Sequence, residues 1–473
     1  MEVSPETKLS KQLAFSYQSF SSPQVEDSLS SNDLVKKHGE RKTVNILFSQ
    51  SAGCCCICLL LASINGVLVS DHERCTALGQ RVLQDGGSSV DAAVAGALCL
   101  GVVHPHVSGV GGGGVMLVHD IHKNQTRVIN FQGTAPKTFR KEMLHNAGLQ
   151  VGVPGMLKGL QHAHSLYGRM LSNDKPGFHL SSSIADAISK VEGEQLSQRF
   201  RDIFIPEGRA LQAGSYVRIP GLAGVLEAGL SNFYYGNLSQ EIEDEVRANG
   251  GVLSRDDISN YSVESVTFVL DYIIQVPPPP SAGAVLISAL NILSENNITE
   301  NQTHPWIAEV PDCKISVYYR LKNQTEMLLQ RMNHSHTPPS DSGQVVVMGP
   351  DDLVVSVASS LNRPFGSRII TRSGIILNSL LLDYLWSNKT QRQLQPKQRP
   401  LLLLMPTIMM PAWRKCGIYT ALSSSGGQNV LHTITQESVQ FIHAEGHVVQ
   451  RGKTNSAVQG IQRRENIIKV IKV

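Results

Sequence analysis

The residue in this chain best placed for chemistry is Ser342, in the stretch "SDSGQVVVMGPDDLVVSVASSLNRPFGS" that runs from Ser340 to Ser367. Ser342 stands just before a short, β-branched apolar run, at the head of a predicted buried strand. A hydroxyl there can act as a nucleophile if the preceding peptide bond is cut. The freed α-amino group, with a pKa of about 8, then serves as its base. The alternative is an ordinary loop serine, and the pattern alone leaves both readings open.

Other motifs point away from metal, nucleotide and esterase chemistry. The H-x-H pairs at 104/106, 162/164 and 334/336 lack Cys, Asp or Glu partners at metal-binding spacing, so surface or core histidines are expected. Gly109, Gly111 and Gly114 match G-x-G-x-x-G, but they lead into a strand-like run instead of a helix. The chain has no G-x-S-x-G elbow. We therefore predict neither a metal nor a cofactor.

The elements that would position Ser342 form a predicted hairpin. Its strands are Val345 to Met348 and Leu353 to Ala358, joined by the turn "GPDD". Both strands are apolar on both faces, as expected for strands between two helical layers.

The rest of this region also indicates a mixed α/β fold. "DGGSSVDAAVAGALCLGVV" predicts a helix, with Ser88 and Asp91 spaced as in a capping box. "SGVGGGGVMLVHD" predicts a glycine loop that enters a strand, and "SAGAVLISALNIL" a buried helix. "RPLLLLMPTIMM" predicts a buried strand bounded by Pro400 and Pro406.

The N-terminal part predicts a membrane anchor. Residues 1–42 are rich in Ser and charge and are expected to be a disordered cytosolic tail. Residues 43–70 contain no Asp, Glu, Lys, Arg or His, and a bilayer core needs about 20 mostly apolar residues. Basic residues precede this span and acidic ones follow it, which places the N-terminus in the cytosol. A buried core helix is the alternative. Cys54, Cys55, Cys56 and Cys58 are read as small apolar residues in preference to palmitoylation sites.

Glycosylation motifs agree with an extracellular or luminal location for residues 71–473. N-x-S/T sequons occur only after the span, at Asn124, Asn237, Asn260, Asn297, Asn301, Asn323, Asn333 and Asn388. Four cysteines follow the span, too few for a disulfide scaffold but enough for one or two bridges.

The net charge of +3 gives no indication of a nucleic-acid partner. With 473 residues and 41% hydrophobic composition, the chain can bury a large α/β core as one domain.

A series of ordered motifs resembles the γ-glutamyltransferases (glutathione hydrolases). The matching segments are "DGGSSVDAAVAGALCLG", "SGVGGGG", "VINFQGTAP", "VGVPGMLKGL", "GGVLSRDDISNY", "ASSLNRPFGS", "GIILNS", "MPTIM" and "SSSGGQ". The resemblance covers most of the chain from about Cys75 onward. It implies the αββα sandwich of the N-terminal-nucleophile hydrolases, a type II membrane glycoprotein and a disulfide between Cys75 and Cys99. It also implies self-cleavage into a large chain ending at Asp341 and a small chain starting at Ser342.

Residue by residue, the resemblance assigns catalytic and binding positions. The family's nucleophilic threonine corresponds to Ser342, and its supporting threonine to Ser360. Its oxyanion glycines correspond to Gly426 and Gly427, whose backbone N–H groups would face the developing negative charge. Anchors for the substrate α-amino group, preserved here, are Asn362 and Asp383.

The sequence departs from the family where the substrate carboxylate would bind. The family's arginine corresponds to Gln132, and its pair of serines to Leu402 and Leu403. The acidic residue between the two amine anchors corresponds to Leu380. Because a hydrogen bond to a charged group contributes about 1.5–3 kcal/mol, loss of the arginine alone is expected to weaken a γ-glutamyl ligand by roughly 10- to 100-fold.

Two functions are therefore carried forward. The first is a membrane-bound enzyme that cleaves γ-glutamyl bonds of glutathione and its conjugates and passes the acyl group to water, an amino acid or a peptide. The second is a membrane glycoprotein of the same fold that acts by binding a ligand.

The stretch after Gly427 is shorter than the family pattern. The completeness of the sandwich in this region is therefore an open question at the level of the sequence.

Overall fold

The computed structural model describes the globular part of the chain in segments. These are residues 66–139, 146–169, 178–179, 182–194, 196–217, 219, 221–268, 274–278, 281, 283, 286–287, 342–384, 397–400, 404–410, 418–425, 434, 457–464 and 467–472.

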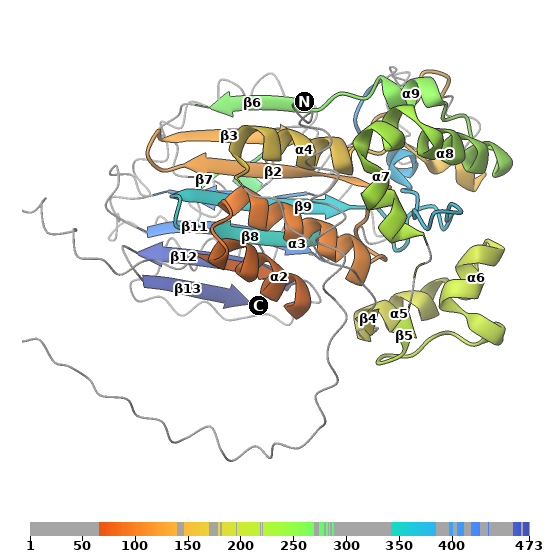
Figure 1. The fold of residues 1–473 in the computed structure, drawn as a ribbon, viewed down its shortest axis with the longest axis horizontal. Coiled ribbons are helices and arrows are strands. Elements are labelled where there is room, and N and C mark those ends of the chain that lie inside the picture. The colour runs from red at the N-terminus through yellow and green to blue at the C-terminus, as the bar shows by residue number, and fades with distance from the viewer. Residues whose placement is uncertain are drawn as a thin grey trace, which may run out of the picture.

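Two antiparallel sheets form the centre of the molecule (Figure 1). The six-stranded sheet has the order β1-β8-β9-β2-β3-β6, with the bounds Val67–Ser70, Gly343–Met348, Leu353–Ser360, Gly113–Asp120, Gln125–Asn130 and Glu264–Phe268. The five-stranded sheet has the order β13-β12-β11-β10-β7, with the bounds Ile467–Lys472, Ala457–Arg464, Ile418–Ser425, Thr407–Met409 and Ile274–Gln275. A small two-stranded sheet pairs β4 (Phe178–His179) with β5 (Tyr216–Val217).

Helices cover one face of the six-stranded sheet and gather at one of its ends. α2 (Glu73–Gln84), α3 (Ser89–Val103) and α4 (Met156–Tyr167) lie over the sheet (Figure 1). The helices at the end are α5 (Ser182–Val191), α6 (Gln198–Phe204), α7 (Leu222–Tyr235), α8 (Asn237–Ala248) and α9 (Arg255–Ser259). Short 3₁₀ turns are η2 (Ala147–Gln150), η3 (Pro206–Gly208) and η4 (Leu380–Tyr384).

The other face of the six-stranded sheet packs on the second sheet. One apolar cluster joins Val346 and Val354 of the first sheet to Ile408, Ala421 and Ile461 of the second. β8 and β9 are apolar on both faces, as predicted, but helices cover only one face and a second sheet covers the other. The described residues thus form three layers of the expected αββα sandwich, one of helices and two of sheet.

The predicted hairpin and helix are confirmed. β8 and β9 pair antiparallel around the Gly349–Asp352 turn. Ser88 begins α3, its hydroxyl accepting from the Asp91 N–H while the Asp91 carboxylate accepts from the Ser88 N–H. The predicted glycine loop enters β2 at Gly113. Local capping and turn chemistry fix these elements, which is why the sequence revealed them.

The predicted disulfide is also present. Cys75 of α2 is bonded to Cys99 of α3, with their Cα atoms 5.4 Å apart. Both cysteines are buried, and α2 and α3 pack closely along their lengths. The bridge therefore ties together two helices of the layer that covers the sheet.

The end of the predicted membrane span is wrong. Val67–Ser70, the last residues of the 43–70 range, form the edge strand β1 and pair with β8. Gly66 precedes this strand in close contact with the hairpin turn, since a Cβ there would come 2.7 Å from the Gly349 Cα atom. Hydropathy cannot distinguish a buried strand from the end of a span. Within the described part of the chain, no helix is long and apolar enough to cross a bilayer; residues 1–65 lie outside that part.

Two further predictions are corrected or left open. The buried strand expected in "RPLLLLMPTIMM" starts only after Pro406, as β10 (Thr407–Met409), and residues 401–403 lie outside the described residues. Most of "SAGAVLISALNIL" also lies outside them, although residues 283, 286 and 287 are helical.

Candidate active site at the head of β8

The strand registers bring predicted site residues into one row. The β8–β9 register, continued by one residue, sets Ser342 opposite Ser360. Ser360 pairs with Gly113 of β2, and the β2–β3 register, continued past Asn130, sets Gln132 beside Gly113. Directly opposed residues of antiparallel strands share a face of the sheet. Three residues that are far apart in the sequence thus meet at one end of the sheet, on the face toward the second sheet.

Ser342 lies at the boundary between the two sheets. Its side chain is buried, and Oγ donates a hydrogen bond of 3.2 Å to the Ser424 carbonyl oxygen of β11. β11 ends one residue later, at Ser425. Gly426 and Gly427 follow directly in the sequence but lie outside the described residues, so their oxyanion role stays a prediction.

Ser360 and Asn362 form a compact pair at the end of β9. The Ser360 hydroxyl accepts a hydrogen bond of 2.8 Å from the Asn362 backbone N–H. Asn362 has a left-handed backbone (φ 80°), and its Nδ2 donates to the Ser379 carbonyl oxygen at 3.0 Å. A carbonyl oxygen can only accept, so this bond fixes the amide, and Asn362 Oδ1 is left buried with no partner among the described residues. That oxygen is an acceptor available to a ligand.

Gln132 is fully buried and neutral. Its Nε2 lies 3.0 Å from the Ser281 Oγ, and its Oε1 has no hydrogen-bond partner within the described part of the chain. Its backbone carbonyl accepts from the Tyr261 hydroxyl at 2.9 Å and from the Arg399 guanidinium at 2.5 Å. Burial raises the pKa of Tyr261 to about 12, which keeps this hydroxyl protonated as a donor.

Leu380 packs against Gly133, the residue that follows Gln132. Its side chain is fully buried, and a Cβ on Gly133 would come 2.4 Å from the Leu380 Cδ1 atom. Asp383 lies in the same 3₁₀ turn, η4, but its side chain is not among those described. Leu402 and Leu403 also lie outside the described residues.

The glycine loop before β2 allows backbone segments to approach closely. A Cβ on Gly112 would lie 2.5 Å from the Ser360 carbonyl oxygen, and one on Gly111 would lie 2.1 Å from the Ile376 carbonyl oxygen. A Cβ on Gly114 would lie 2.4 Å from the Ala358 carbonyl oxygen. These three glycines therefore allow β9 and the loop that follows it to pack closely against β2 and the loop that precedes β2.

A family model described as Gamma-glutamyltranspeptidase matches residues 75–310 and 296–451, which is well over half of the sequence. The chain belongs to the gamma-glutamyltranspeptidase family.

Curated relatives agree with this assignment. Glutathione hydrolase 7 of Homo sapiens is 37% identical over 510 residues, covering 86% of this chain and 77% of that protein. Glutathione hydrolase 5 proenzyme of Rattus norvegicus is 25% identical and covers 85% of this chain and 86% of that protein. Among solved structures, cephalosporin acylase from Bacillus halodurans has a TM-score of 0.64 at 18% identity and covers 89% of this chain and 96% of its own. At that identity the last match shows the fold alone.

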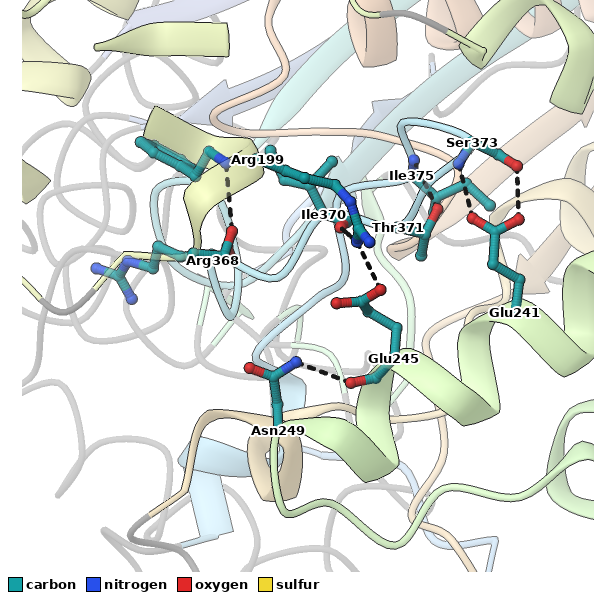
Figure 2. Close-up of polar contacts among 11 residues, drawn as sticks. Arg199, Glu241, Glu245, Asn249, Arg368, Ile370, Thr371, Ser373 and Ile375 are labelled. Atoms are coloured by element: carbon teal, nitrogen blue, oxygen red, sulfur yellow. Dashed lines mark hydrogen bonds and ion pairs between the residues drawn. The ribbon is translucent and has the colours of Figure 1, made fainter. Parts of the chain in front are cut away.

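The loop that follows Asn362 is held by helices from the earlier part of the chain (Figure 2). The Glu241 carboxylate of α8 accepts from the Ser373 N–H and from the Ser373 hydroxyl, both at 2.6 Å. Arg199 of α6 donates to the Ile370 carbonyl oxygen at 2.8 Å and pairs with Glu245 of α8 at 2.5 Å. We name these contacts the loop clamp.

The loop clamp acts on strained backbone. Phe365 and Arg368 both have left-handed φ angles, 58° and 61°, which non-glycine residues with bulky side chains seldom adopt. Phe365 is held by ring contacts with Phe200 and Phe204 at 5.0 and 4.9 Å. Such strain persists only where the surroundings over-determine the conformation. Sequence reasoning missed the clamp because α6 and α8 carry no motif that links them to this loop.

A row of histidines lies near the same end of β8 and was also missed as a group. The His104 ring contacts the rings of His72 and His106, with centroids 5.1 and 5.2 Å apart. Burial, with a smaller effect of His72, lowers the pKa of His104 to about 3, and burial also lowers the pKa of His106 well below its usual value. These are neutral core histidines at neutral pH. Among the described residues, no group of three or more His, Cys, Asp or Glu could hold a metal ion.

The other H-x-H pairs do not form comparable groups. His164 of α4 lies 3.5 Å from the Asp91 carboxylate, while His162, two residues earlier, has a side-chain nitrogen without a hydrogen-bond partner. The pair at 334/336 lies outside the described residues.

Three sequons lie in the described part. Asn237 and Asn260 are exposed, and Asn124 is half-exposed in the turn between β2 and β3. The other five, Asn297, Asn301, Asn323, Asn333 and Asn388, lie outside it.

Proposed function

We propose that this family member is an N-terminal-nucleophile enzyme that cleaves γ-glutamyl bonds, with glutathione and its conjugates as the first substrates to test. The acyl group passes to water or to the amine of an amino acid or peptide. The observation that carries the proposal is the position of Ser342: it heads a buried strand, lies opposite Ser360, and touches the end of β11 that leads to Gly426 and Gly427. The names of the relatives, glutathione hydrolases, support the substrate class.

The nucleophile is released by cleavage between Asp341 and Ser342. The Ser342 hydroxyl attacks the Asp341 carbonyl carbon, an ester replaces the peptide bond, and water then hydrolyses the ester. The products are a new carboxylate at Asp341 and a free amine on Ser342. One relative is named a proenzyme, which fits a processed product. The large chain then ends at Asp341 and the small chain begins at Ser342.

Turnover uses the same hydroxyl with the freed amine as base. Ser342 Oγ attacks the γ-carbonyl carbon, and its proton passes through the amine to the departing amine of the substrate. Backbone N–H groups of Gly426 and Gly427 stabilise the oxyanion. Water or an acceptor amine then attacks the ester and restores Ser342. Asn362 Oδ1 accepts from the substrate α-amino group, with Asp383 as the second anchor.

The neutral residues Gln132 and Leu380 support a competing role, in which the fold binds a ligand without turning it over. The decisive assay is release of glutamate from glutathione and γ-glutamyl amides by the full-length chain and by Ser342→Ala. Release that depends on Ser342 supports the enzyme. Equal, background release from both proteins, together with ligand-induced stabilisation, would favour the binding role.

We also propose that the chain is a single-pass type II membrane protein whose catalytic part lies outside the cytosol. The anchor ends before Gly66, because β1 already belongs to the sheet. The exposed sequons Asn237 and Asn260 support this topology. Glycosidase treatment of the protein from mammalian cells should increase its mobility on a gel, and unchanged mobility would contradict the topology.

A further inference from the structure

Three buried amide side chains have oxygen atoms that accept no hydrogen bond from the described residues. Two lie at the candidate active site, and the third lies on the face of the five-stranded sheet that packs against the six-stranded sheet. Gln132 Oε1, Asn362 Oδ1 and Gln275 Oε1 are all buried, and none has a hydrogen-bond partner among the residues that the structure describes. Gln132 stands in the row with Ser342, and Asn362 follows Ser360 by two residues. Gln275 pairs across β7 and β10 with Ile408, which belongs to the apolar cluster between the sheets. Buried polar atoms are nearly always paired, so these oxygens indicate a ligand with hydrogen-bond donors.

The orientation of two of these amides is fixed by acceptors. Asn362 donates to the Ser379 carbonyl oxygen, and Gln275 donates to the Met410 sulfur at 3.8 Å. The Gln132 amide contacts a hydroxyl, on Ser281, which can either donate or accept. Whichever way the Gln132 amide is turned, one of its polar atoms is left without a partner and neither atom carries a charge.

The nearby positive charge is already engaged. The Arg399 guanidinium donates to the Gln132 and Ser262 carbonyl oxygens and pairs with Glu264 at 3.1 Å. The residue after Gln132, Gly133, packs against the aliphatic side chain of Leu380. A carboxylate buried against Gln132 would lose its hydration and meet a guanidinium, that of Arg399, which is already paired, whereas a neutral amide would gain hydrogen bonds from the Gln132 amide.

We infer that the site selects γ-glutamyl donors whose α-carboxyl group is a neutral amide or peptide bond over donors, such as glutathione, whose α-carboxylate is free. This inference rests on the proposed function. The chemistry balances as in ordinary acyl transfer: the Ser342 Oγ–carbon bond forms, the γ-amide C–N bond breaks, and the serine proton leaves with the amine. Hydrolysis of the ester then releases glutamate that still carries its α-amide.

The test uses the full-length chain and two γ-glutamyl p-nitroanilides that differ only at the α-carbon, one a free carboxylate and the other a primary carboxamide. Release of p-nitroaniline gives kcat/KM for each. We expect the carboxamide to be preferred by about tenfold or more, the ratio that corresponds to one good hydrogen bond or pairing. Gln132→Arg should reverse the preference, since a guanidinium pairs with a carboxylate. Gln132→Met, which has similar size but makes no amide hydrogen bond, should abolish it.

The outcomes separate the inference from the proposed function. A higher kcat/KM for the free carboxylate in the wild type would overturn the inference and leave the enzyme intact. No turnover of either compound, with Ser342→Ala indistinguishable from the wild type, would overturn both. Gln212→Arg, on an exposed loop, is the matched control and should leave the ratio unchanged. If Gln132→Arg fails to unfold cooperatively, Gln132→Met decides: an unchanged carboxamide preference in that variant would contradict the role of Gln132.

Discussion

Asn362 combines a special backbone conformation with a ligand-binding side chain. Its φ of 80° suits asparagine better than most residues, and its side chain bridges to Ser379 while leaving one oxygen free. Because the same residue contributes to folding and to binding, a single substitution would mix the two effects. Two substitutions separate them.

We expect Asn362→Ala to lower the free energy of unfolding by about 2 kcal/mol, since it removes a buried hydrogen bond and puts a Cβ residue in a left-handed conformation. Asn362→Gly keeps the backbone unstrained and should lose only about 1 kcal/mol. Both variants should raise KM for the acyl donor to a similar extent. Urea denaturation and initial-rate kinetics give the two readouts. A KM that rose only in the alanine variant would show that backbone strain, and not the amide, explains the binding effect.

The buried histidines predict loss of stability in acid. The pKa of His104 is lowered to about 3 in the folded protein, from its usual value of 6.5. The unfolded chain therefore binds the proton first as pH falls below 6.5. The stability that neutral His104 contributes is fully present above pH 6.5. As the pH falls from 6.5 toward the pKa of His104 in the folded protein, the free energy of unfolding decreases by up to about 1.4 kcal/mol per pH unit. His106 acts in the same direction.

The measurement is urea denaturation at several pH values between 7.5 and 5. The slope of unfolding free energy against pH should be shallower in His104→Gln than in the wild type. Gln212→Ala, at an exposed position that does not titrate, is the control and should keep the wild-type slope. Parallel slopes for the wild type and His104→Gln would contradict a neutral, buried His104.

At the scale of elements, the loop clamp joins helices that precede Ser342 to the loop that follows β9. Glu241→Ala removes two charge-assisted hydrogen bonds to Ser373 and should cost about 1.5–3 kcal/mol. The loop from 366 to 377 should become more sensitive to proteolysis, and KM should rise while kcat changes little, because Asn362 loses its support.

Glu192→Ala provides the matched control, as Glu192 is an exposed acid beyond the end of α5. It should leave proteolysis and KM unchanged. If Glu241→Ala behaved like Glu192→Ala, the clamp would not position the loop.

The Cys75–Cys99 bridge closes a sequence separation of 24 residues between α2 and α3. The chain-entropy model gives about 3.5 kcal/mol for a loop of this length. A reducing agent should therefore lower the melting temperature of the wild type but leave that of the Cys75→Ser/Cys99→Ser double variant unchanged. A reductant effect of equal size in both proteins would point to another bridge.

Elements with local signals could be predicted from the sequence, and those set by long-range register could not. The hairpin, the capped α3 and the glycine entry to β2 each have turn or capping chemistry within a few residues. The row that contains Ser342, Ser360 and Gln132 depends on three strand registers. The loop clamp depends on two helices that are distant in the sequence. Hydrophobicity also misassigned β1, because a buried edge strand and the end of a membrane span are equally apolar. Ser342 was singled out by its place before a buried strand, whereas the roles of the other site residues came from the family resemblance.

At the scale of the whole molecule, the predicted cleavage would not divide the fold into separate bodies. β8 and β9 come after Ser342, yet they lie between β1 and β2 in the six-stranded sheet. β7 comes from the earlier part and pairs with β10 in the other sheet. The two chains would share both sheets, so they should remain together under native conditions and separate only on denaturation.

The measurement that tests the central claim most directly is the intact mass and N-terminal sequence of the denatured protein, for the wild type and Ser342→Ala. The account predicts two chains in the wild type, the smaller beginning at Ser342, and one uncut chain in the variant. Ser342→Thr retains the hydroxyl and is expected to be cleaved at the same bond. A wild-type chain that stays whole, or a cut that persists in Ser342→Ala, would contradict Ser342 as the nucleophile.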